Sequence, residues 1–350
     1  MALPYTRSEV KERARAQWHG ACNVTLPSFT TSFDGLNARA IEHDIRHGAS
    51  LGFWGTLVAA ESGTTFPEYL RFMEISAGAA PKGFNLVVHL SCDTVAEMRE
   101  AAKTAETLGY EAALLSYPPS FNPKSAQEIV DFSRDIADAT DIALILFAVP
   151  TWGFGGLHPS KFPPEAVAAM AKFTTAAAVK YEANPPAMTT GMADMLRRCK
   201  NDVLLECPLE QYAPGLHDWF GMQWIGTSAY DSFGDRVPTV MRLLREGQWD
   251  AAMEVYWSYQ AAREAKGGFH ATFAGANLIH RMGWKYMSWL HGGSGGLLRM
   301  PQMRLLPNQM AALRTGLAKS GYTLPANDDG FREGRLPVES AMDLAPAGMR

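Results

Sequence analysis

The clearest chemical potential in the sequence belongs to a lysine at the end of a short apolar run. Lys180 follows Thr175–Val179 and precedes Tyr181 and Glu182. Burial at the carboxyl end of a strand makes a charged lysine costly, because loss of solvent favours the neutral amine. A neutral amine is a nucleophile that forms a Schiff base with a ketone. The alternative is a surface lysine whose ammonium group stays in water.

The elements around Lys180 predict a parallel α/β fold. Short apolar runs alternate with amphipathic stretches, as in repeated strand and helix units. The runs that read as strands are 21–26, 55–60, 85–90, 112–117, 142–149, 176–181, 203–206 and 223–227. Helical patterns such as 95–108 and 125–137 lie between them. We predict a (β/α)8 TIM barrel, and no strand is followed by the GxGxxG of an open dinucleotide-binding sheet.

The sequence predicts a barrel with additions at both ends. Residues 1–18 read as an extension helix, 19–235 as the barrel, 236–320 as a C-terminal helical region and 321–350 as a tail. Within the helical region we expect helices over 237–245 and 249–265, and a last helix with its entry turn over 301–320. The tail lacks periodicity, so we expect it to wrap over a surface or to be disordered.

Composition narrows the classes of function. The 350 residues carry a net charge of −4 and no basic run, which argues against nucleic acid as a partner. No apolar stretch is long enough for a membrane span and the N-terminus is charged, so we expect a cytoplasmic protein. The four cysteines lack paired spacing, and the histidines lack partner ligands, so neither zinc nor iron chemistry is indicated. We expect no cofactor.

Further candidates lie where the other predicted strands end, because catalytic groups of such barrels gather there. Strand two runs into a loop with Ser62 and Gly63, which suits a carboxylate held by backbone N–H groups and hydroxyl donors. An ordinary turn is the alternative for this loop. The remaining candidates for substrate binding are His89, Phe121, Phe147 and Thr227.

Several of these segments, taken in order, resemble one family of enzymes. They are the loop with Gly63, the run 117–123 (YPPSFNP), Val149-Pro150, Ala178-Val179-Lys180, Gly292-Gly293 and Arg299-Met300-Pro301. The series resembles the dihydrodipicolinate synthase and N-acetylneuraminate lyase family over about residues 18 to 320. The resemblance implies a homotetramer or homodimer that joins a lysine to pyruvate or another 2-oxo acid. It assigns Lys180 to the Schiff base, and Ser62 and Gly63 to the substrate carboxylate.

The departures from the family pattern bear on proton transfer. Phe147 and Phe121 stand where the family has tyrosines, and phenylalanine cannot carry a proton. Glu61 replaces a hydroxyl residue, and 151–153 (TWG) stands where the lysine-biosynthetic enzyme has an arginine. Dihydrodipicolinate synthase activity is therefore not expected. Glu61 is our first candidate for the acid or base, with an ion pair to Lys180 or to an interface arginine as the alternative.

His89 is the second candidate for proton transfer, and a hydrogen-bonded core histidine is its alternative. Tyr181 should point away from Lys180 by strand alternation, so we treat it as a packing residue. Aromatic residues that could line the barrel mouth favour an aromatic or apolar partner for the 2-oxo acid. They are Phe121, Phe147, Trp152, Phe154, Trp219 and Trp224.

The function expected is a class I lyase of the aldolase type that acts on pyruvate or a related 2-oxo acid. A hydratase-aldolase with an aromatic partner is one form of it, since those enzymes carry a Lys-Tyr pair similar to Lys180-Tyr181. A dehydratase of a 2-oxo sugar acid, working through the same Schiff base, is an alternative. Another is a regulatory protein that binds a 2-oxo acid without turning it over.

Overall fold

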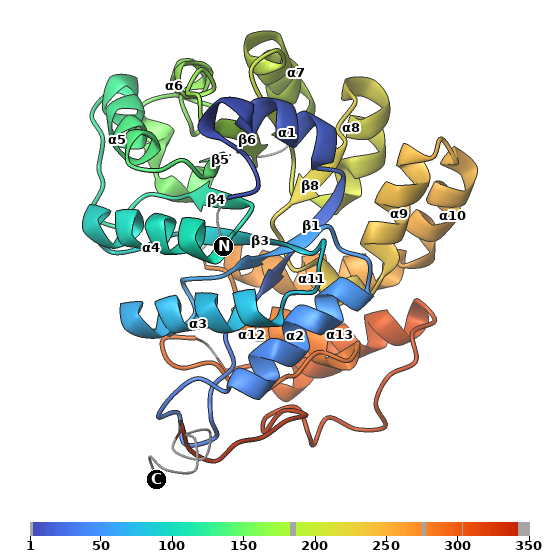
Figure 1. Ribbon diagram of the computed structural model, residues 1–350. Coiled ribbons are helices and arrows are strands. Elements are labelled where there is room, and N and C mark those ends of the chain that lie inside the picture. The colour runs from blue at the N-terminus through green and yellow to red at the C-terminus, as the bar shows by residue number, and fades with distance from the viewer. Residues whose placement is uncertain (1–2, 183–186, 275–277, 303, 342–350) are drawn as a thin grey trace. The chain divides into compact units, whose positions relative to one another are not determined.

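The computed structural model describes residues 3–182, 187–274, 278–302 and 304–341 (Figure 1). The chain divides into two compact units. The first comprises residues 1–22 and 85–228, and the second comprises residues 23–84 and 229–350. Each unit contributes strands to a single sheet.

Eight strands form one sheet in the order β7-β6-β5-β4-β3-β2-β1-β8. Their bounds are Gly20–Thr25 (β1), Gly55–Val58 (β2), Asn85–Leu90 (β3), Ala112–Leu115 (β4), Ala143–Ala148 (β5), Ala176–Tyr181 (β6), Leu204–Glu206 (β7) and Trp224–Gly226 (β8). The pairings resolved residue by residue are parallel. With helices alternating between the strands, the predicted (β/α)8 barrel with C-terminal helices is confirmed.

The barrel is nearly closed, and a side chain joins the two ends of the strand order. The backbone N–H of Gly226 in β8 donates to Oε2 of Glu206 in β7 at 3.1 Å. Inward positions on β6 are small, since Ala176 and Ala178 alternate with outward Ala177 and Val179. This leaves interior space above them for the longer side chain of Lys180.

In the first unit a helix follows each of the strands β3 to β7 (Figure 1). These helices are Val95–Leu108 (α4), Ala126–Asp138 (α5), Pro164–Met170 (α6), Ala187–Cys199 (α7) and Ala213–Phe220 (α8). The ends of α4 show why the sequence predicts it: Thr94 and Glu97 form a capping box. Gly109 ends the helix with φ of 78°, a conformation that glycine adopts without strain.

The N-terminal extension belongs to the first unit. It contains a short 3-10 turn, Arg7–Glu9, and the helix α1, Val10–Gln17. Arg13 donates to both carboxylate oxygens of Glu111 at 2.8 and 2.9 Å, and Trp18 donates its indole N–H to the same group at 2.9 Å. Glu111 is buried, so these donors satisfy a carboxylate that would otherwise be costly to bury.

The second unit contains the other helices. They are Ala38–Ser50 (α2), Phe66–Ala79 (α3), Arg236–Arg245 (α9), Trp249–Ser258 (α10), Gln260–Ala274 (α11), Arg281–Leu290 (α12) and Pro307–Lys319 (α13). Within this unit α2 packs against α3, α9 against α10, and α11 against α13. The amphipathic α2 is capped by Asn37, whose side chain accepts the N–H of Ala40.

One predicted helix differs from those observed. The pattern over 249–265 divides at Tyr259, which is buried against Phe233 with ring centroids 5.0 Å apart. This tertiary contact breaks the helix without a glycine or proline to mark it. The last helix begins at Pro307, after the entry turn that the prediction over 301–320 includes, because proline is pre-set for the first helical position and Gln309 caps the N–H of Leu306.

The tail over 321–341 packs on other residues of the second unit. This agrees with the expectation that it covers a surface. Phe331 is buried beside Tyr286 and Trp289 of α12, with ring centroids 5.0 and 5.8 Å away. Residues 342–350 lie outside the described part of the chain.

Among the described residues, no helix is long and apolar enough to cross a membrane. The four cysteines are buried and unpaired with one another. In the same described ranges, no group of three or more His, Cys, Asp or Glu residues could hold a metal ion.

Candidate active site

Lys180 lies near the carboxyl end of β6 and is 5% exposed. Strand alternation directs it to the barrel interior, while Tyr181 faces the other way and packs against α7. The Tyr181 hydroxyl lies so close to Gly191 of α7 that a Cβ added there would come within 2.6 Å of it. The Tyr181 side chain therefore lies on the helix side of the strand, outside the barrel. The prediction that Tyr181 is a packing residue is confirmed.

Two acceptors and a ring hold the amino group of Lys180. Its Nζ donates to the carbonyl oxygen of Thr227 at 2.9 Å and to the Thr227 hydroxyl at 3.3 Å. The ring centroid of Phe147 lies 4.1 Å from Nζ, and Phe147 is the Cα partner of Lys180 in the neighbouring strand. Phe147 and Thr227, both predicted for this site, are thus brought to the amine. An apolar ring and two acceptors leave the nitrogen oriented and poorly hydrated.

Two carboxyl groups flank this amine. Glu182, two residues beyond Lys180, has Oε2 4.0 Å from Nζ and is partly exposed. Burial raises the pKa of Glu182, against the lowering effect of Lys180. Glu206 is the Cα partner of Lys180 in β7 and is fully buried. Its pKa is raised well above the usual range by burial, which outweighs Lys180 and the N–H of Gly226.

His89 and Phe121 contact side chains other than Lys180. His89 is buried at the end of β3, with Nε2 3.0 Å from the hydroxyl of Ser116. Phe121 stacks on Tyr117 at 5.3 Å and lies 4.5 Å from the ring of Phe132 in α5. Phe121 is therefore part of an aromatic cluster that also includes Phe154, 5.9 Å away.

Two tryptophans expected at the barrel mouth lie elsewhere, and that expectation is wrong for them. Trp224 opens β8, and its buried ring packs on Trp18 with centroids 5.3 Å apart, at the amino ends of β1 and β8. Side chains at the first residue of a strand lie far from its carboxyl end. Trp219 belongs to α8 and is 64% exposed.

In the second unit, Glu61 forms an ion pair. Its Oε2 accepts from Nη2 of Arg281 at 2.7 Å, and Arg281 is buried. Burial lowers the pKa of Arg281, while Glu61 counters that effect. An arginine partner is the alternative weighed for Glu61, although Arg281 comes from the same chain. Its role in proton transfer stays a prediction.

Ser62 and Gly63 follow Glu61 in the loop after β2. Ser62 is fully buried, and its hydroxyl oxygen has no hydrogen-bond partner among the described residues. Gly63 has φ of +86°, and a Cβ there would come within 2.9 Å of the Arg299 side chain, so this position requires glycine. The loop therefore has a fixed backbone and one unused buried hydroxyl.

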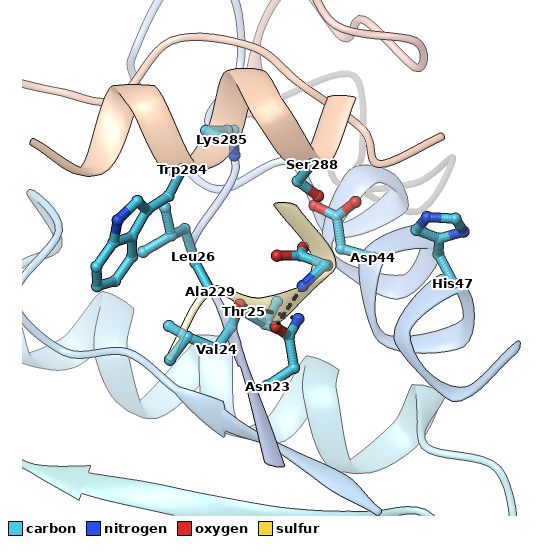
Figure 2. Close-up of a pocket in the computed structure, with 11 residues that line it drawn as sticks. Asn23, Val24, Thr25, Leu26, Asp44, His47, Ala229, Trp284, Lys285 and Ser288 are labelled. Carbon is cyan, nitrogen blue, oxygen red and sulfur yellow. Dashed lines mark hydrogen bonds between the residues drawn. The ribbon is translucent and has the colours of Figure 1, made fainter. Parts of the chain in front are cut away.

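A small polar pocket lies within the second unit (Figure 2). Lys285 and Ser288 of α12 line it together with Asp44 and His47 of α2, and Asn23 accepts the N–H of Asp231 at 3.1 Å. Its volume of about 20 Å³ holds a water molecule and not an organic substrate. Burial lowers the pKa of Lys285 to about 8 and raises the pKa of Asp231 to about 6.

Sequence reasoning gave no role to Glu182 or Glu206. The signal for Glu206 is the one that identifies Lys180: an ionisable residue that ends an otherwise apolar strand. Their pairing could not be read from the sequence, because it depends on the register between β6 and β7.

The chain is similar to several known proteins. A sequence model described as the dihydrodipicolinate synthetase family matches residues 32–260. N-acetylneuraminate lyase from Enterobacter sp. (strain 638) is 23% identical over 240 residues, which cover 66% of this chain and 75% of that protein. N-acetylneuraminate lyase from Escherichia coli O1:K1 / APEC is 25% identical over 133 residues, which cover 36% of this chain and 44% of that protein.

Solved structures agree in fold. Dihydrodipicolinate synthase from Oceanobacillus iheyensis matches with a TM-score of 0.74 and 15% identity, covering 89% of this chain and 99% of that one. N-acetylneuraminate lyase from Fusobacterium nucleatum matches with a TM-score of 0.71 and 17% identity, covering 86% and 98%. The match of the family model over most of the barrel, together with this fold, shows that the chain belongs to the dihydrodipicolinate synthetase family, whose members are lyases of the aldolase type.

Proposed function

We propose that this protein forms a Schiff base between Nζ of Lys180 and the ketone of pyruvate or a related 2-oxo acid. The observation that carries the proposal is the buried amine at a barrel strand end, oriented by Thr227 and Phe147. The iminium group withdraws electrons from the neighbouring carbon, so a carbon–carbon bond one atom further away breaks or forms through an enamine. In this proposal Lys180 is the nucleophile.

Other residues of the proposal serve the substrate. We assign its carboxylate to Ser62 and Gly63, which is supported by the unpartnered hydroxyl of Ser62 and the fixed backbone of Gly63. Glu61 remains our candidate for the group that moves a proton on the substrate. His89 is also proposed to bind the substrate, with its ring held by the hydrogen bond to Ser116.

The substrate's second part is proposed to be aromatic or apolar. The aromatic cluster of Tyr117, Phe121 and Phe154, with Trp152 5.7 Å from Tyr117, supports this. The absence of the two tyrosine hydroxyls at Phe121 and Phe147 disfavours dihydrodipicolinate synthase chemistry. We further propose a cytoplasmic enzyme that acts as a homotetramer or homodimer.

The test is a panel of substrates with two arms. Arylidene pyruvates are assayed for release of an aromatic aldehyde, and 2-oxo-3-deoxy sugar acids for loss of water. We expect turnover in the first arm. Turnover in the second arm alone would replace the aldolase by a dehydratase. Schiff-base formation with pyruvate but no turnover in either arm would replace it by a 2-oxo-acid-binding protein.

A further inference from the structure

Only one of the two carboxyl oxygens of Glu206 has a hydrogen-bond partner among the described residues. Oε2 accepts the N–H of Gly226 at 3.1 Å, but Oε1 is buried and has no hydrogen-bond partner among the described residues. The side chain has no measurable exposure. Leaving a buried carboxyl oxygen unpaired costs free energy, so its retention requires a reason other than packing.

Glu206 and Lys180 are neighbours on adjacent strands. They are Cα partners in the adjacent parallel strands β7 and β6, so both side chains face the interior. Glu206 meets the N–H of Gly226, and Lys180 meets the carbonyl oxygen of Thr227, the next residue. The carboxyl group and the amino group therefore end at consecutive residues of the chain at the end of β8.

Few charged or titratable groups among the described residues face Glu206. Lys180 faces it from β6 and Glu182 from the end of that strand, while Cys207 adjoins it in the chain. On β8 it meets the backbone of Gly226. Burial raises the pKa of Glu206 well above its ordinary value, and Glu182 adds to the rise. Burial therefore favours the protonated form of this carboxyl group.

We propose that Glu206 is the acid that supplies the proton for imine formation at Lys180 and then the counter-ion of the iminium. The inference rests on the proposed function, because it concerns the same lysine. It adds an acid that acts at the nitrogen end of the reaction, separate from the group that moves protons on the substrate.

Imine formation at Lys180 conserves atoms and charge. Neutral Nζ attacks the ketone carbon, the C–N bond forms, and a proton moves from nitrogen to the former carbonyl oxygen. The C–O bond then breaks, the oxygen leaves as water with the proton of Glu206, and the nitrogen lone pair forms the C=N bond. Amine, carboxylic acid and ketone become iminium, carboxylate and water, with no net change in charge. Burial makes the new carboxylate a strong counter-charge for the iminium.

The experiment compares the wild type with Glu206→Gln. The amide has the shape of the neutral acid but carries no transferable acidic proton, so the variant is expected to fold. Glu182→Gln is the matched control, since it removes the other carboxylate near Lys180, at 4.0 Å. Each protein is mixed with excess pyruvate, trapped with borohydride at successive times and weighed intact, to give the rate of imine formation.

The wild type should form the imine fastest, and Glu182→Gln should keep most of that rate because the acid stays in place. Glu206→Gln should form the imine about a hundredfold more slowly, since a general acid contributes about 10²–10⁴ to a rate. Equal rates for Glu206→Gln and the wild type would overturn the inference.

A second measurement covers a variant that does not fold. Imine formation by the wild type should be measurably slower in deuterated water than in ordinary water, because a proton moves from the acid to the leaving oxygen. Equal rates in the two solvents would overturn the inference. Absence of any adduct on the wild type would instead overturn the proposed function, so the two failures are distinct.

Discussion

Lys180 and Thr227 are joined across the barrel by two contacts, from Nζ to the Thr227 carbonyl oxygen at 2.9 Å and to its hydroxyl at 3.3 Å. The first contact is with the backbone and persists whatever side chain stands at 227. The second contact can be removed by substitution. The pair therefore separates the part of the amine's orientation that the fold supplies from the part that a side chain supplies.

Thr227→Val should slow Schiff-base formation about two- to tenfold, because one hydrogen bond to the amine contributes about 0.5–1.5 kcal/mol. The rate is measured by borohydride trapping with pyruvate. Thr175→Val is the matched control, since its buried hydroxyl has no hydrogen-bond partner among the described residues. An unchanged rate in Thr227→Val would show that the backbone contact alone positions the amine.

Ser62→Ala should weaken binding of the 2-oxo acid without destabilising the protein. The hydroxyl is buried and unpartnered among the described residues, so its loss breaks no internal bond. We expect the half-saturating concentration of pyruvate to rise about tenfold, as for loss of one charge-assisted hydrogen bond, and the urea midpoint to hold.

Ser76→Ala controls for that substitution. Ser76 of α3 is equally buried and its hydroxyl likewise has no partner in the described part of the chain, but no role in binding is proposed for it. Equal effects of the two alanine substitutions on pyruvate binding would contradict the assignment of Ser62.

Glu61→Gln should destabilise the protein by about 1 to 3 kcal/mol, because it leaves the buried Arg281 without its anionic partner. The range is reduced for the partial exposure of Glu61, at 43% of its side chain. Urea unfolding measures the loss, and the double variant Glu61→Gln/Arg281→Met should recover part of it.

The same double variant tests whether Glu61 moves protons. If Glu61 transfers a proton, turnover by the double variant should stay low even though its stability is recovered. Turnover that returns together with stability would assign Glu61 to the ion pair alone.

Asp231 should make stability depend on pH between about 4 and 6. Burial raises its pKa from the ordinary 3.8 to about 6, so the folded protein binds a proton more tightly than the unfolded chain. The stabilising contribution is complete below the unfolded pKa and is lost as pH rises through the folded pKa. From pH 4 to about 6.5, wild-type stability should fall by about 2 kcal/mol more than that of Asp231→Asn.

The exposed Glu100 provides a control for the pH series. Glu100→Gln should keep the wild-type dependence of unfolding free energy on pH. A profile of Asp231→Asn that runs parallel to both would mean that Asp231 does not carry the predicted dependence.

The order of strands and helices was predictable because each element carries local signals. The strand β6 and the helix α4 were predicted with the bounds observed, since an apolar run and a capping box each mark their own ends. The division at Tyr259 was missed, because a buried ring contact and not a local residue type ends α10.

Site residues were predictable where the sequence places them at the carboxyl end of a strand. Lys180, Thr227 and Phe147 were identified in this way and do lie together. Trp224 was misplaced because its position within a strand decides which end of the barrel it occupies. Glu206 was passed over because its importance lies in its register with Lys180, which one sequence does not encode locally.

Lys180 is proposed to be the amine that captures a 2-oxo acid. The most direct measurement is incubation with pyruvate and borohydride, followed by intact mass and peptide mapping of the wild type, Lys180→Met and Lys285→Met. Lys285 is the appropriate control because it is also buried and its pKa is lowered to about 8. We expect one adduct, mapped to Lys180, present in Lys285→Met and absent from Lys180→Met. An adduct that persists in Lys180→Met, or no adduct on the wild type, would contradict it.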